Sequence, residues 1–184
     1  FSRKARKLCP GIPVVLMAIH HRELEQEREE ANKAYDNVFI WNGESKMLLT
    51  IIKLVEDRMN VAADTDQVGV RVIILVENSV RFYSSYLPLM YTEIMRQASA
   101  LLRESINRST QRVRMRARPK ILLAENFEDA VELFEQYREY LLGVISDIRF
   151  PRQGKSDDSA GIELARLIKS EISDLPVLLQ SSDQ

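Results

Sequence analysis

Residues 70–77 read VRVIILVE, an apolar run that ends in an acidic residue. A strand without polar alternation is typical of a parallel sheet, because helices cover both faces of such a sheet. The chain contains five further short apolar runs of this kind, at 13–19, 37–41, 120–124, 143–148 and 176–180. Longer segments with helical periodicity separate most of them. This alternation predicts an α/β fold with three layers, α/β/α, built on a parallel sheet.

The predicted helices cover residues 22–34, 45–61, 84–109, 127–141 and 161–172. The helix at 45–61 carries apolar residues three and four positions apart, which predicts a buried face made of Leu48, Leu49, Ile52, Val55 and Met59. In the helix at 84–109, we expect Pro88 to lie in the first turn, where its missing N–H costs little.

An internal repeat predicts two related modules, since residues 1–19 resemble residues 164–182 when Pro13 is set on Pro176. We therefore expect three parts in the chain. These are the C-terminal half of a degenerate module at 1–61, a linker (AADTDQVG) at 62–69, and a second module at 70–184 that lacks its last strand and helix. The strands at 13–19 and 37–41 either complete the sheet of the second module or belong to a separate one.

Composition argues against several classes of partner. The net charge is −1 and the sequence pI about 6.2, so no basic field draws the chain to nucleic acid or to an anionic membrane. The apolar runs are too short to span a bilayer. Alternating arginines at 112–118 favour a solvated or interdomain stretch. Because Cys9 is the single cysteine, we expect a reducing, cytoplasmic compartment.

Polar residues stand where the strands of the second module end. Glu77 and Asn78 follow the first strand, Asp147 closes the third, and Ser181 and Ser182 follow the fourth. The carboxyl ends of parallel strands meet at one edge of the sheet. This set suits phosphoryl transfer, with Asp147 as nucleophile, Glu77 and Asn78 as oxygen ligands of Mg²⁺, and Ser181 as hydrogen-bond donor. The alternative is that each acid merely caps a helix or lies in a solvated loop.

Four of these segments resemble the response-regulator receiver domain of two-component signalling and phosphorelays: VIILVEN, VISDIRFP, AGIELARLIK and LPVLLQSS. The resemblance implies a flavodoxin-like sheet with strand order 2-1-3-4-5. It also implies that Asp147 is the phospho-acceptor and Ser181 the switch hydroxyl. The Mg²⁺ ligands would then be Glu77, Asn78, Asp147 and the backbone carbonyl of Arg149.

The chain departs from the receiver pattern at several positions. In the first module, Ala18 and Trp41 stand where the family has a hydroxyl and a lysine, which indicates a pseudo-receiver. In the second, Asn78 replaces an acidic ligand, so Mg²⁺ should bind more weakly. The loop at 152–160 is longer than the usual turn, and we expect its Asp157 and Asp158 to be solvated.

A second resemblance is to receiver-like regions that precede a phosphoenolpyruvate synthase or pyruvate phosphate dikinase type of domain. The segments that carry it are SVRFYSSYLPLMYTEIMRQ, RMRARPKILLA and RFPRQGK. It implies the regulatory part of a phosphotransferase that handles pyruvate or phosphoenolpyruvate. The leading hypothesis is thus a receiver-like regulator whose partner is a sensor kinase or an attached output domain.

Two other functions compete with this hypothesis. One is a non-phosphorylated pseudo-receiver that acts as an interaction scaffold or homodimer. The other is an aspartyl phosphatase, which would need a second acid at the position that Arg149 occupies.

Overall fold

The computed structural model describes residues 4, 8–9, 11–19, 35–103 and 118–181, with side chains for all but 101–103. The helix expected at 22–34, the end of the helix expected at 84–109, the arginines at 112–116 and Ser182 lie outside the described residues. None of the helices in the described part of the chain combines the length and the apolar character that crossing a bilayer requires.

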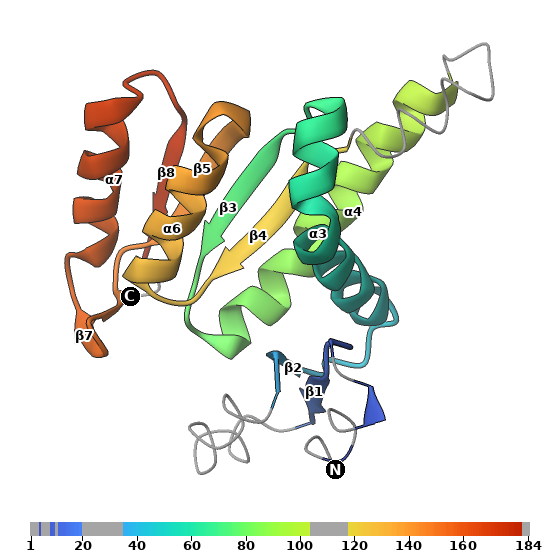
Figure 1. Cartoon of the computed structure of the whole chain (residues 1–184). Helices are drawn as coiled ribbons and strands as arrows, with labels where there is room; N and C mark the ends of the chain where they lie inside the picture. The colour runs from blue at the N-terminus through green and yellow to red at the C-terminus, as the bar shows by residue number, and fades with distance from the viewer. Residues whose placement is uncertain (1–3, 5–7, 10, 20–34, 104–117, 182–184) are drawn as a thin grey trace.

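The centre of the fold is a four-stranded parallel sheet in the order β4-β3-β5-β8 (Figure 1). Its strands are β3 (Val72–Val76), β4 (Lys120–Ala124), β5 (Leu141–Asp147) and β8 (Val177–Gln180). One face packs on α4 (Val80–Arg103), and the other packs on α6 (Phe127–Tyr137) and α7 (Ala160–Glu171). A short 3₁₀ turn, η1 (Arg138–Tyr140), leads from α6 into β5. The predicted α/β fold with a helix-covered parallel sheet is confirmed.

β3 is apolar at every position because it contributes side chains to two hydrophobic cores, one on each face of the sheet. Ile74 and Val76 belong to the core under α6 and α7, whereas Leu75 belongs to the core under α4. Successive side chains of a strand point to opposite faces, so a strand covered on both sides must be apolar at every position.

The two N-terminal strands form a sheet of their own. β1 (Val15–Ala18) and β2 (Asn37–Ile40) pair in parallel and do not join the four-stranded sheet. Phe39 of β2 packs edge-on against Tyr83 of α4, and the Tyr83 hydroxyl donates a hydrogen bond to the Val38 carbonyl. Of the two arrangements that the sequence allowed, the structure therefore has the separate sheet, anchored on α4.

Helix α3 (Lys46–Val68) runs through the segment that we expected to be a linker. The small residues at 62–68 do not break the helix, because Val61 and Thr65 are buried and the Thr65 hydroxyl donates to the Val61 carbonyl. The helix ends at Gly69, whose positive φ of 67° suits a left-handed C-terminal cap. Only two residues, at 70 and 71, therefore lie between this cap and the start of β3.

The buried face of α3 differs from the prediction. Leu48, Leu49, Ile52 and Met59 are 47–64% exposed, whereas the buried residues are Met47, Thr50, Leu54, Asp57, Val61 and Thr65. The hydrophobic spacing pointed to the wrong side because this helix turns a carboxylate, Asp57, toward the edge of β4.

A buried ionic cluster surrounds that carboxylate. Arg118 donates to both oxygens of Asp57, at 2.6 and 3.1 Å, and the backbone N–H of Ile121 and the hydroxyl of Tyr91 donate at 3.0 and 2.9 Å. Lys120 lies 3.6 Å from the same carboxylate and 2.7 Å from that of Asp64. The cluster links α3, α4 and β4, and nothing in the hydrophobic pattern indicated it.

Two further expectations require correction. Helix α4 begins at Val80, so Pro88 lies in its interior and not in the first turn; the earlier start buries Tyr83 beside Leu87. The loop expected at 152–160 is largely an antiparallel hairpin of β6 (Phe150–Arg152) and β7 (Lys155–Asp157). Its two turn residues, at 153 and 154, have positive φ, which favours a tight two-residue connection.

Candidate functional site

The candidate site lies where three adjacent strands end. Glu77 directly follows β3, Asp147 is the last residue of β5, and Gln180 is the last residue of β8. The register pairs Val76 with Ser146 and Asp147 with Gln180, so these ends are level at one edge of the sheet. The structure thus places Glu77 and Asp147 near each other at this edge.

Glu77 is a buried acid in a weakly hydrated position. Its residue is 1% exposed, and its carboxylate accepts hydrogen bonds from the Ser79 backbone N–H at 2.9 Å and the Gln180 side-chain amide at 3.4 Å. Burial, with a smaller contribution from the charge of Asp147, raises the pKa of Glu77 to about 7 although these hydrogen bonds lower it. Glu77 therefore retains a proton at a higher pH than an ordinary glutamate does.

Asp147 is held by the backbone that follows it. The residue is 7% exposed, and one carboxylate oxygen accepts a hydrogen bond from the Ile148 N–H at 2.8 Å. The first turn of α7 presses against this turn, since the Gly161 N–H donates to the Ile148 carbonyl at 2.9 Å. A Cβ atom on Gly161 would lie 2.2 Å from the Asp147 carbonyl oxygen, so the close approach needs a glycine.

The other predicted residues surround this pair less closely. Asn78 is half-buried immediately after Glu77, and Ser181 is exposed immediately after Gln180. The side chain of Arg149 forms an ion pair with Asp158, 2.7 Å away. Asp158 is 83% exposed, as expected, whereas Asp157 accepts hydrogen bonds from the backbone and hydroxyl of Ser159 just before α7.

Gln180 is the member of the site that sequence reasoning missed. The sequence pattern points to the hydroxyl at 181, whereas it is the side chain at 180 that reaches across β5 to Glu77. The signal was available in principle, because Gln180 is the only polar residue in the run at 176–180 and stands at the end of its strand.

Magnesium fits this edge of the sheet, but with few charged ligands. Mg²⁺ prefers oxygen ligands and keeps several waters, and two carboxylates and an amide converge here. A cation would also relieve the repulsion that Asp147 exerts on Glu77. Among the described residues, however, no group of three or more His, Cys, Asp or Glu side chains is placed to hold a metal ion.

The raised pKa of Glu77 predicts a pH-dependent stability. Its folded pKa of about 7 lies above the ordinary value of 4.5, so the folded state retains a proton that the unfolded state loses. Ionising Glu77 therefore opposes folding, and stability should fall as the pH rises from about 4.5 to 7. Glu77→Gln should remove this loss, so that thermal melts show the variant to be more stable than wild type at pH 8. The exposed acid variant Glu132→Gln serves as control, and equal pH profiles for all three proteins would contradict the prediction.

Comparison of the chain with protein-family models, with curated proteins and with solved structures finds no match. The functional assignment therefore depends on the geometry of the site and on the resemblance of short motifs.

Proposed function

We propose that residues 70–181 form a regulatory module similar to a response-regulator receiver, phosphorylated on Asp147. The observation that carries this proposal is the convergence of Glu77 and Asp147 at the carboxyl ends of adjacent parallel strands. The observed order β4-β3-β5-β8 is compatible with a flavodoxin-like sheet, whose full order is 2-1-3-4-5. Ligand sites of such sheets lie outside the carboxyl ends of the strands, which is where these acids lie.

The proposed chemistry is phosphoryl transfer to a carboxylate. An oxygen of Asp147 forms a bond to the phosphorus of a donor, and the bond from phosphorus to the leaving group breaks. Ser181 would donate a hydrogen bond to the transferred group. When bound, Mg²⁺ would offset the charge of the phosphoryl oxygens; Glu77, Asn78, Asp147 and the carbonyl of Arg149 would hold it.

The fold offers a route by which phosphorylation could change a surface. Because α7 begins against the backbone of Asp147 and Ile148, a displacement at the acceptor shifts the start of this helix. The partner would be a cytoplasmic sensor kinase, or an attached output domain such as one of the phosphoenolpyruvate synthase type.

Phosphorylation can be tested with a small-molecule phosphodonor and Mg²⁺, read by intact mass. Wild type should gain one phosphate, and Asp147→Asn should gain none. Asn78→Asp supplies the acid that the metal site lacks, so it should raise the phosphorylated fraction at low Mg²⁺. If wild type and Asp147→Asn gain the same mass, Asp147 is not the acceptor.

The second candidate function is a non-phosphorylated scaffold or homodimer. The specific observation that favours it is the shortage of carboxylates, two where three acids would bind Mg²⁺ more firmly. A solution mass of twice the monomer together with no detectable Mg²⁺ binding would support this function over the first.

A further inference from the structure

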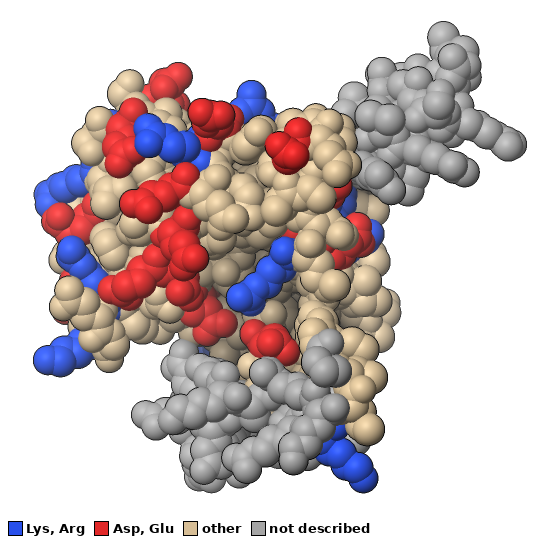
Figure 2. All heavy atoms as spheres, in the orientation of Figure 1, with Lys and Arg blue, Asp and Glu red and all other residues tan. Residues whose placement is uncertain are grey.

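A cleft of about 610 Å³ is lined by residues of β2, α3, β4 and α6, and none of these residues belongs to the edge that carries Asp147. Figure 2 shows acidic side chains gathered along one side of this hollow. The lining is mixed: apolar residues such as Leu54, Val61, Leu122 and Leu133 contribute to it beside a larger number of polar ones. Its volume lies within the range of about 300–1,000 Å³ that is usual for ligand sites.

The open edge of β4 faces this cleft. The Lys120 N–H donates to the Arg71 carbonyl and the Ala124 carbonyl accepts from the Glu77 N–H, so these residues point their backbone groups toward β3. Backbone groups alternate along a strand, and those of Ile121 and Leu123 therefore point away from β3. Within the described part of the chain, β4 pairs with β3 alone.

Helix α3 covers only the beginning of this edge. The carboxylate of Asp57 accepts the outward N–H of Ile121, which satisfies one backbone donor without a further strand. Leu123 lies two residues further along the same edge, is partly exposed and lines the cleft. An unpaired strand edge in a cleft is the geometry in which an extended peptide adds as a further strand.

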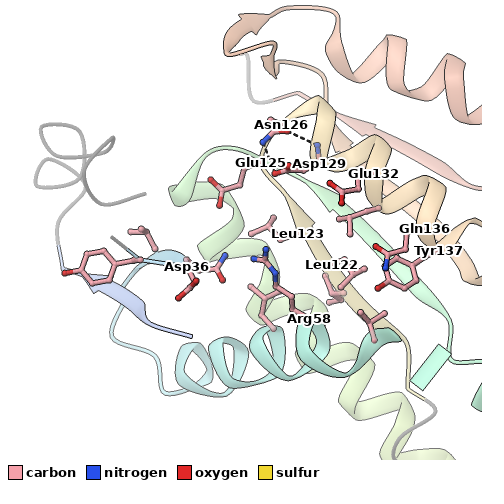
Figure 3. A pocket seen from close by; sticks show the side chains of 17 residues that line it. Asp36, Arg58, Leu122, Leu123, Glu125, Asn126, Asp129, Glu132, Gln136 and Tyr137 are labelled. Carbon is pink, nitrogen blue, oxygen red and sulfur yellow. Dashed lines mark hydrogen bonds between the residues drawn. The ribbon is translucent and has the colours of Figure 1, made fainter. Parts of the chain in front are cut away.

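The charges around the cleft select the kind of peptide. Four acidic residues line it: Asp36, Glu125, Asp129 and Glu132. Figure 3 shows Arg58 directed into the same space from α3, and it is the one cation among the lining residues that the structure describes. The Asp36 carboxylate already accepts the Val14 N–H at 2.7 Å, and the Asp129 carboxylate accepts the Asn126 side-chain amide at 2.8 Å. Asp129 and Glu132, both on α6, outnumber the one described cation of the lining and favour basic side chains.

We propose that this cleft binds an extended basic peptide segment of a partner protein, which pairs with the edge of β4 at Leu123. Alternate side chains of the peptide would face the apolar residues of the lining, and the basic side chains between them would meet its acidic residues. The partner is thus recognised by a strand that alternates basic and apolar residues.

The charge requirement is tested with a short synthetic peptide that alternates arginine and valine, titrated into the full chain. Glu132→Lys should weaken binding about tenfold, because it replaces attraction with repulsion beside the peptide. Glu135→Lys makes the same change on the same helix but outside the cleft, so it should leave binding unchanged. Arg58→Ala should tighten binding. Both glutamates are exposed, and a thermal melt of each variant confirms that it is folded.

The strand requirement is tested with the same peptide after methylation of alternate backbone nitrogens. This change keeps the charges and removes the N–H groups that a strand uses, so binding should be lost, and the amide of Leu123 should be protected from hydrogen exchange only by the unmethylated peptide. No binding of the original peptide overturns the proposal. Equal weakening by the two lysine variants overturns it as well, because binding would then not depend on the acids of the cleft. So does full binding of both methylated peptides, one methylated at the odd and one at the even backbone nitrogens, because the peptide would then bind without forming a strand.

Discussion

Asp57→Asn is expected to lower the free energy of unfolding by about 3–5 kcal/mol, the usual cost of breaking a buried ion pair by removing one partner. The side chain of Asp57 is fully buried and that of Arg118 is 3% exposed. Burial disfavours the charged form of Arg118, but the hydrogen bonds and ion pair with Asp57 raise the pKa of its guanidinium. Without the carboxylate, a buried cation remains with little compensation.

The variant would also weaken the hydrogen bonds that Asp57 accepts from neighbouring elements. Burial and the adjacent carboxylate raise the pKa of Tyr91, so its hydroxyl remains protonated and donates to Asp57. The Ile121 N–H at the edge of β4 would face a neutral amide in place of a charged acceptor. We therefore expect the loss to be cooperative, with α3 released from the sheet.

Denaturant unfolding of wild type and Asp57→Asn measures this effect. Glu56→Gln is the matched control, because this neighbouring acid is 37% exposed and its carboxylate lies 3.8 Å from Arg118. The control should change stability by less than about 1 kcal/mol. A loss of similar size in both variants would show that the cluster is not the principal attachment of α3.

Gly161→Ala is expected to cost at least about 3 kcal/mol, the upper end of the usual range for overpacking. The added Cβ would lie 2.2 Å from the Asp147 carbonyl oxygen and 2.9 Å from the Ile148 Cα. Both atoms belong to the backbone, so relief requires α7 or the end of β5 to move. The same displacement should abolish phosphorylation of Asp147.

Gly143→Ala provides a graded comparison for that substitution. Its Cβ would lie 3.2 Å from the Pro176 carbonyl oxygen, a tight contact that a shift of a few tenths of an ångström relieves. It should therefore cost less in denaturant unfolding and leave phosphorylation intact. If both alanine variants change the free energy of unfolding and phosphorylation equally, the close approach at Gly161 has no special importance.

The parallel sheet could be predicted because its strands are buried on both faces. An apolar run such as β3 has few alternatives once helical segments separate it from the next strand. The prediction of the buried face of α3 was wrong because a polar residue of this helix is part of the buried interface. Asp57 lies among the apolar residues of α3 and is buried, while Ile52 and Met59 are exposed, so hydrophobic spacing alone chose the wrong face of the helix.

The site was predictable to the extent that it depends on strand ends. Glu77 and Asp147 follow from the rule that the carboxyl ends of parallel strands share an edge. The sequence marks Gln180 as a polar residue at a strand end, but only the register of β8 on β5 shows that its side chain, and not that of Ser181, reaches Glu77. The cleft beside β4 was not predictable, since it forms between segments whose packing depends on the Asp57 cluster.

The central claim is that Asp147 carries an acyl phosphate, and site-resolved chemistry tests it most directly. After treatment with phosphodonor and Mg²⁺, borohydride reduction converts an aspartyl phosphate to homoserine, which peptide mass spectrometry locates. We expect homoserine at position 147 in wild type and none in a sample without phosphodonor. An unmodified Asp147, or homoserine at another aspartate alone, would contradict the claim.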